Sequence, residues 1–192
     1  MNVITKTMKK LQTGFTLVEL MITLVIAAIL LSMAVPSFIT TLQNNRIVTQ
    51  ANNFVTSLNI ARSEAIKRGA RITVCKSADN ASCTGAGSWN QGWIIFVDAN
   101  SDAAVNLGEE LIRAYGPIEG GNTLNGTGNV ANYISYVNTG FSQLTSGGLQ
   151  SGEIVLCDDR GFVATSRVII LSATGQIRPV PTDDAAVTAA AC

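Results

Sequence analysis

The fold is decided by one stretch near the N-terminus, Lys9-Lys10-Leu11-Gln12-Thr13-Gly14-Phe15-Thr16-Leu17-Val18-Glu19-Leu20. A short basic leader meets a long apolar run at the Gly14-Phe15 junction, and the run continues to Val35 with few polar interruptions. A helix of roughly 20 apolar residues spans the hydrocarbon core of a bilayer. The sequence therefore predicts a transmembrane helix over residues 15–36.

Charged residues before and inside the apolar run indicate its orientation and a candidate functional residue. Lys6, Lys9 and Lys10 precede the apolar run and the next cation is Arg46, so the positive-inside rule predicts a single pass with a cytoplasmic N-terminus. Glu19 lies inside the run. A carboxylate in hydrocarbon is costly, and without a partner it is rare, so Glu19 is a candidate functional residue.

This pattern resembles the class III signal of type IV prepilins and type II secretion pseudopilins. The resemblance implies that a prepilin peptidase cuts after Gly14, at the end of a leader spanning residues 1–14, and methylates the new amino terminus at Phe15. It also implies that Glu19 neutralises the new ammonium, on the same or a neighbouring subunit. A secretory signal has a shorter apolar core and a small-residue cleavage site, and a plain anchor has no use for Glu19.

The start of the chain stays open. Translation from Met1 gives the full leader, whereas translation from Met8 gives a shorter leader that fits the family better.

Composition narrows the chemistry of the rest. The chain has 13 basic and 13 acidic residues, and removal of three leader lysines leaves 13 − 3 = 10 basic residues, a mature chain three charges acidic. Such a chain is a poor global attractor for nucleic acid. Histidine is absent, which excludes Ser-His-Asp and Cys-His nucleophile systems and His-ligated zinc. We expect no enzyme activity, no cofactor and no metal.

Four cysteines in an exported domain predict two disulfides. Three pairings are possible. The local pair Cys75–Cys83 is favoured because it brackets a Ser/Gly/Asn-rich loop, which leaves Cys157 for Cys192.

Beyond Pro36, which should kink or locally open the helix, an apolar seam recurs at spacings of four and three residues. This seam predicts an amphipathic continuation over residues 37–69 that ends at Gly69. Its members are Ile47, Ala51, Phe54, Leu58, Ala61 and Ala65.

From residue 70 to 192 the pattern is that of short strands separated by Gly/Asn/Ser turns, which predicts an antiparallel β domain. The expected strands are 71–75, 92–97, 110–115, 133–137, 152–157 and 167–171, and residues 120–132 are expected to form a mobile loop. The fold class is α+β: a long N-terminal helix packed on a small antiparallel sheet domain. Trp89, Trp93 and Phe96 are interpreted as core and edge aromatics rather than base-stacking residues.

The order of elements resembles the GspH/FimT branch of minor pilins. The residues that carry this resemblance are Ala61-Arg62-Ser63-Glu64-Ala65, Trp89-Asn90-Gln91-Gly92-Trp93-Ile94-Ile95-Phe96, Cys157-Asp158-Asp159-Arg160-Gly161 and Gly175-Gln176-Ile177-Arg178.

Some members of this family are thought to bind DNA through a Gly-Arg-x-Arg motif. In this chain Gln176 replaces the first arginine, which leaves Arg178 with Arg160 and Arg167 in neighbouring segments. Each lost cation removes roughly one phosphate contact. DNA is therefore a possible but weak partner.

A second motif falls between two expected strands. Asp98, Asn100, Asp102 and Glu109 match positions of a calcium-binding EF-hand loop, but Ala103 replaces the required glycine. A polar hairpin turn is the favoured interpretation.

Together these observations predict an assembly protein: a minor pilin in the inner membrane that enters a type IV pilus, near the tip, beside other pilins. The alternative is the H-type minor pseudopilin of a type II secretion system.

Overall fold

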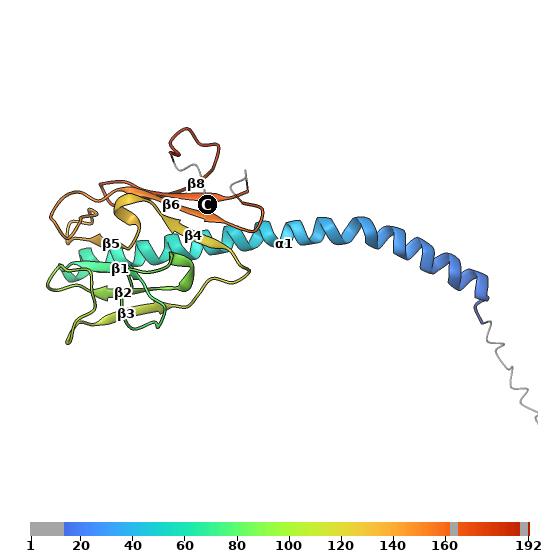
Figure 1. Ribbon diagram of the computed structural model, residues 1–192, viewed down its shortest axis with the longest axis horizontal. Helices are drawn as coiled ribbons and strands as arrows, with labels where there is room; N and C mark the ends of the chain where they lie inside the picture. Colours follow the sequence, from blue (N-terminus) through green and yellow to red (C-terminus); the bar gives the residue numbers. More distant parts are fainter. Residues whose placement is uncertain (1–13, 162–164, 189–191) are drawn as a thin grey trace, which may run out of the picture. The chain divides into compact units, whose positions relative to one another are not determined.

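A computed structural model describes residues 14–161, 165–188 and 192. The expectations for residues 1–13, including the two possible starts, lie outside the described residues. The chain divides into two compact units, residues 1–42 and 43–192, which are described separately below. One helix, α1 (Leu17–Arg68, 52 residues), supplies the first unit and enters the second (Figure 1).

The predicted seam of α1 is confirmed. All six of its members are buried, and Gly69 ends the helix with φ of +65°, a left-handed conformation that glycine adopts without strain. Lys67 and Arg68 lie in the last turn, where cations complement the helix dipole. The helix is continuous through Pro36, and Thr40 Oγ1 donates to the Pro36 carbonyl oxygen at 3.1 Å.

Eight strands form two four-stranded antiparallel sheets. The first sheet has the order β3-β2-β1-β5, and the second has the order β4-β6-β7-β8. The strands of the first sheet are β1 (Ile72–Lys76), β2 (Trp93–Val97), β3 (Leu111–Tyr115) and β5 (Tyr133–Tyr136). Those of the second are β4 (Thr123–Gly126), β6 (Gly152–Cys157), β7 (Arg167–Leu171) and β8 (Ile177–Pro181). Two 3₁₀ turns, η1 (Trp89–Gln91) and η2 (Gly128–Val130), complete the domain.

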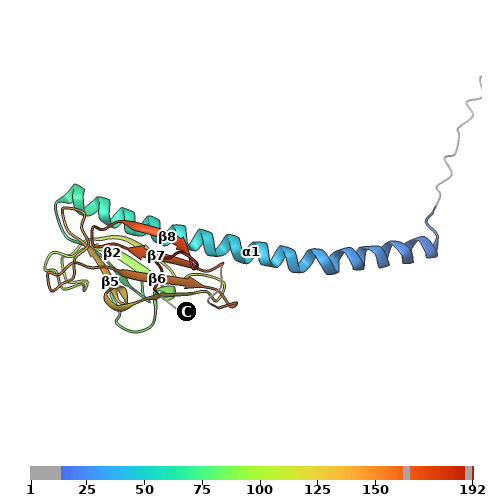
Figure 2. The same cartoon turned by 90° about the horizontal axis from the view of Figure 1, so that it is seen from above.

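One hydrophobic core joins the seam of α1 to both sheets. Phe54 is fully buried and packs edge-on against Trp89 and Trp93, with ring centroids 5.3 and 5.0 Å away. Ile95 enters this core from the first sheet and Ile169 from the second. In Figures 1 and 2 both sheets lie alongside the turns of α1 that follow residue 43. The aromatic residues are therefore core residues, as predicted.

One expectation about the strands was wrong, and one strand was missed. Residues 120–132 do not form a single loop, because Thr123–Gly126 pairs with β6 as strand β4 and Gly128–Val130 forms η2. Strand β8 was not expected at all, and its two prolines explain why. All of β1 is buried, and it lies between β2 and β5 in the first sheet.

Candidate functional site

The expected processing site lies just before the first turn of α1. Gly14 and Phe15 precede the helix, and Thr16 Oγ1 accepts a hydrogen bond from the backbone N–H of Glu19 at 3.2 Å. Thr16 and Glu19 therefore occupy the first and last positions of a Thr-x-x-Glu capping box. Glu19 lies in the first turn, where the helix dipole favours negative charge.

The surface of this first unit is apolar. From Phe15 to Leu42 no described residue is buried, and Phe15 itself is 81% exposed. Within the described part of the chain, α1 is long and apolar enough to cross a membrane. Water is a poor solvent for such a surface, so lipid or other apolar helices must cover it.

The structure contains both expected disulfides. Cys75 bonds to Cys83 and Cys157 to Cys192, and no cysteine is free. The second bond joins Cys192 to Cys157, the last residue of β6. Asn125 of the neighbouring strand β4 donates its side-chain amide to the Cys192 carbonyl oxygen at 2.8 Å. The tail residues 189–191 lie outside the described part.

The three arginines considered for DNA have different surroundings. Arg160 is half-buried against Asp158, with Nε 2.9 Å from Oδ2, and its Nη2 also donates to Asn44 Oδ1 at 2.9 Å. This guanidinium holds the pKa of the Asp158 carboxyl below its usual value. Arg160 is therefore already neutralised by a carboxylate.

Arg167 and Arg178 project from opposite faces of the second sheet. Arg178 is opposite Ile170 in the register, three positions along β7 from Arg167, and side chains of a strand alternate between faces. Arg167 donates to the carbonyl oxygens of Thr165 and Ser166, whereas Arg178 is exposed and lies 3.5 Å from Asp184. The three arginines do not form one basic patch.

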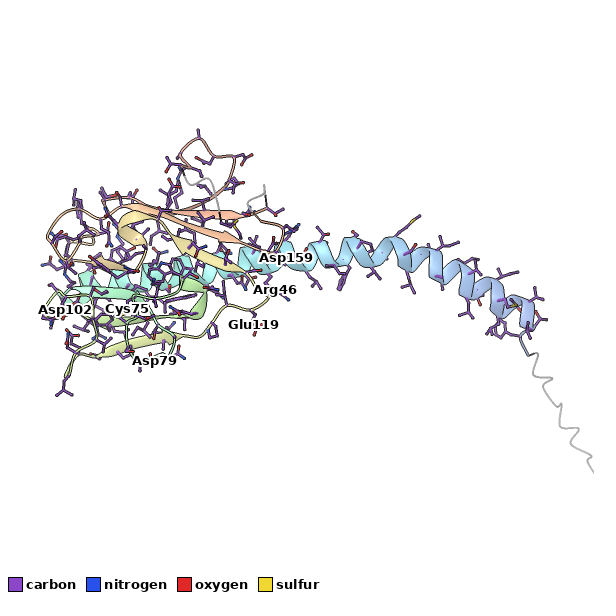
Figure 3. The ribbon with its side chains drawn as sticks, in the orientation of Figure 1. Arg46, Cys75, Asp79, Asp102, Glu119 and Asp159 are labelled. Carbon is purple, nitrogen blue, oxygen red and sulfur yellow. A yellow bond between two sulfur atoms is a disulfide. The ribbon has the colours of Figure 1, made fainter. Side chains whose placement is uncertain are left out.

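The loop between β2 and β3 uses its carboxylates internally. Asp98 is fully buried and accepts from Thr73 Oγ1 at 2.7 Å and from the backbone N–H groups of Asp102 and Ala103. Glu109 accepts from the N–H groups of Ala99 and Asn106. Among the described residues no cluster of three or more acidic, Cys or His side chains could hold a metal ion. Figure 3 labels Asp102 in this hairpin loop.

Sequence reasoning missed two residues of interest. The Thr-x-x-Glu spacing could have identified Thr16 as a cap. Arg62 is the second: it reaches from α1 to the carbonyl oxygens of Gly140 and Thr174, at 2.9 and 3.2 Å. Its partners are far away in sequence, so no local pattern indicates this role.

Known proteins resemble this chain in two separate regions. Residues 50–175 match the family described as Type II transport protein GspH, and residues 9–35 match the prokaryotic N-terminal methylation motif. No curated protein sequence gives a significant match.

Two solved structures share the fold. The type IV minor pilin FimU of Pseudomonas aeruginosa superimposes with a TM-score of 0.58 at 18% identity, over 73% of this chain and 92% of that chain. The minor pseudopilin EpsH from the type II secretion system of Vibrio cholerae superimposes with a TM-score of 0.51 at 10% identity, over 73% of this chain and 98% of that chain. The GspH match covers more than half of the sequence, and the methylation motif falls on the expected cleavage site. The chain belongs to the GspH family of pilin-like proteins.

Proposed function

We propose that this protein is a minor pilin that is cut between Gly14 and Phe15, methylated at Phe15 and assembled through α1 into a type IV pilus, near its tip. The observation that carries the proposal is the coincidence of the methylation motif with a capped helix start that presents Glu19 in its first turn. Cleavage creates an ammonium group at Phe15, four residues from Glu19, where a carboxylate can neutralise it.

Before assembly the chain spans the inner membrane once, with a cytoplasmic N-terminus and a periplasmic domain. The uniformly exposed apolar surface of residues 15–42 supports this location, because the same surface can exchange lipid for neighbouring pilin helices. The partners of the chain are then prepilin peptidase and the other subunits of the filament.

A second candidate function is that of the H-type minor pseudopilin of a type II secretion system. The family description and the fold shared with EpsH favour this candidate. Deletion of the gene separates the two: loss of surface pili and twitching supports the pilus, whereas periplasmic retention of secreted proteins supports secretion. The genes beside it provide an independent test.

The role in either system is structural. The buried side chains of the β domain form a packed core, and Asp98, Glu109 and Arg160 are bonded to neighbouring groups of the domain. Binding of DNA remains a weaker possibility, because two of the three candidate arginines face opposite sides of one sheet. Recovery of the processed chain in sheared and purified filaments tests the proposal, and its absence from them in an otherwise piliated strain contradicts it.

A further inference from the structure

The free edge of β8 is closed by two prolines. Ser172 N donates to Gln176 O at 2.9 Å, and bonded and non-bonded pairs alternate along an antiparallel ladder. Because β7 pairs Ile169 with Pro179 and Arg167 with Pro181, both prolines fall where an N–H would point away from the sheet. They remove the donors that another strand would need.

The free edge of β5 is covered by the chain that follows it. Gln143 N donates to Ser135 O at 3.0 Å, Ser142 forms a bridge with Tyr136, and Gln150 Oε1 accepts from Ser135 N at 2.9 Å. The outward N–H and carbonyl of Ser135 and the carbonyl of Tyr133, which accepts from Gln150 Nε2 at 2.8 Å, are therefore already bonded.

The edge of β3 is different. Val97 N donates to Glu110 O and Asp98 N donates to Arg71 O, so alternate residues of β2 bond to opposite neighbours. Since Trp93 pairs with Tyr115, the backbone groups of Ala114 point away from the sheet. Among the described residues no loop or side chain bonds to them.

A bulge between Ile95 and Phe96 makes the ladder irregular at the start of β3, so the open stretch runs from Arg113 to Gly116. Beside Gly116 there is open space: an added Cβ would meet no atom within 4 Å. From Arg113 to Gly116 this edge contains no proline, and no segment of the described residues bonds to it.

A groove of about 410 Å³ continues this edge toward α1. Tyr115 stacks on Trp93 with ring centroids 5.2 Å apart and forms one wall with Pro117 and Ile118. The opposite wall is polar and comes from five residues of α1: Asn45, Arg46, Thr49, Gln50 and Asn53. The volume suits a few side chains of a bound peptide.

Two arginines lie at the groove and at the open edge beside it. Arg46 lines the groove, and Arg113 shares the face of Tyr115, whose hydroxyl lies 3.4 Å from Arg113 Nη1. Among the described residues, neither guanidinium has a carboxylate within 4.0 Å. Of the described residues in the groove wall, Arg46 is the one cation and Glu119 the one anion, and Arg113 adds a second cation on the adjoining face of β3. Figure 3 shows Arg46 and Glu119 at the same end of the domain.

We propose that the edge of β3 and this groove bind an extended, acidic segment of another protein subunit by strand addition. The backbone of the segment pairs with Ala114, and its alternate side chains enter the groove, where a carboxylate reaches Arg46 or Arg113. The assignment of the partner as another filament subunit rests on the proposed function. The prediction that the site binds an extended, acidic peptide does not depend on that function.

Peptide binding to the full chain in detergent micelles tests this proposal. The probe is a labelled seven-residue peptide of alternating Val and Glu, with a Val/Lys peptide as its charge control, measured by fluorescence anisotropy. We expect the Val/Glu peptide to bind about tenfold more tightly at low salt, because its carboxylates complement Arg46 in the groove and Arg113 on the edge. Methylation of alternate backbone nitrogens in that peptide removes its main-chain donors and should weaken binding about tenfold.

Matched variants locate the site. Ala114→Pro removes the outward N–H and should weaken binding about tenfold, whereas Ala173→Pro makes the same change in the turn after β7, a position suited to proline, and should have no effect. Arg46→Glu should reverse the preference in favour of the Val/Lys peptide.

Equal binding of the two peptides, unchanged binding after Ala114→Pro, or no binding of Val/Glu peptide at millimolar concentration overturns the proposal. The Arg46→Glu and backbone-methylation results keep it testable if Ala114→Pro does not fold. Failure here leaves cleavage at Gly14 and entry into filaments untouched, because those are measured on the processed protein in cells.

Discussion

Arg62 links the two sheets through the backbone of Gly140. Its Nε donates to the Gly140 carbonyl oxygen at 2.9 Å, and its Nη2 donates to the Thr174 carbonyl oxygen at 3.2 Å. Gly140 follows β5 of the first sheet, and Thr174 lies in the turn between β7 and β8 of the second. One cation of α1 thus joins a loop of each sheet through charge-assisted hydrogen bonds.

Substitution of Gly175 tests this junction. Gly175 has φ of +76°, and a Cβ at this position would lie 2.1 Å from the Gly140 oxygen that Arg62 binds. Gly175→Ala should therefore cost both backbone strain and a displaced loop, about 3 kcal/mol in the free energy of unfolding. Urea unfolding of residues 43–192, the unit that contains the buried core, measures it.

Gly147→Ala is the matched control for that variant. Gly147 has φ of +90° but nothing within 4 Å of an added Cβ, so only the backbone strain of about 1–2 kcal/mol applies. Equal costs for the two variants would show that the approach of Gly175 to Gly140 has no energetic weight.

The carboxylate of Glu19 should matter for assembly rather than insertion. Glu19→Gln and Glu19→Leu should insert at least as readily as the wild type, because a charge is removed from the apolar segment. Incorporation into filaments should fall about tenfold or more, since 1.4 kcal/mol of lost pairing with the Phe15 ammonium gives a tenfold change. Quantitative immunoblots of membrane and filament fractions measure both steps.

Thr16→Val separates the cap from the charge. It removes the acceptor of the Glu19 N–H while leaving the carboxylate, and it should cost only about 1 kcal/mol of helix stability. If Glu19→Gln entered filaments as readily as the wild type, the charge of Glu19 would be dispensable for assembly.

The two disulfides should contribute unequally to stability. Chain-entropy estimates give about 4 kcal/mol for the bond that spans 35 residues and about 2.5 kcal/mol for the bond that spans 8. Replacing both cysteines of each pair by serine and comparing urea midpoints measures the difference. A larger loss from the Cys75–Cys83 pair would contradict the loop-length argument, because Cys75 and Cys157 are equally buried.

Binding of DNA to the isolated domain should be weak. The mature chain is acidic, Arg160 is paired with Asp158, and Arg178 projects from the face opposite Arg167. Gln176 is exposed, so Gln176→Arg should strengthen duplex binding and steepen the salt slope by about one unit. Tight wild-type binding at physiological salt, or no gain from Gln176→Arg, would contradict this description of the surface.

The sequence predicted those helices and strands whose own residues show a helical period or a run of apolar side chains. The α1 seam has a helical period, and the inner strands β1, β2, β6 and β7 are largely apolar. Both kinds of element were therefore predictable from sequence. Strand β4 was not, because Thr123-Leu124-Asn125-Gly126 forms a strand only by pairing with β6. Strand β8 contains Pro179 and Pro181, and proline argues against a central strand but is tolerated in an edge strand.

The candidate sites divide in the same way. The Gly14-Phe15 junction and Glu19 lie in one continuous motif, which sequence reasoning can find. The Arg62 junction and the β3 edge depend on contacts between segments far apart in the chain, and only the structure brings them together.

The most direct test of the account is the identity of the N-terminal residue of the mature protein. Mass spectrometry of the chain recovered from filaments should find N-methyl-phenylalanine at Phe15, with residues 1–14 removed. Gly14→Glu should block cleavage and leave the full precursor in the membrane, whereas Gly14→Ala should be cut slowly. A chain with an intact leader in assembled filaments would contradict the central claim that cleavage at Gly14 licenses assembly through α1.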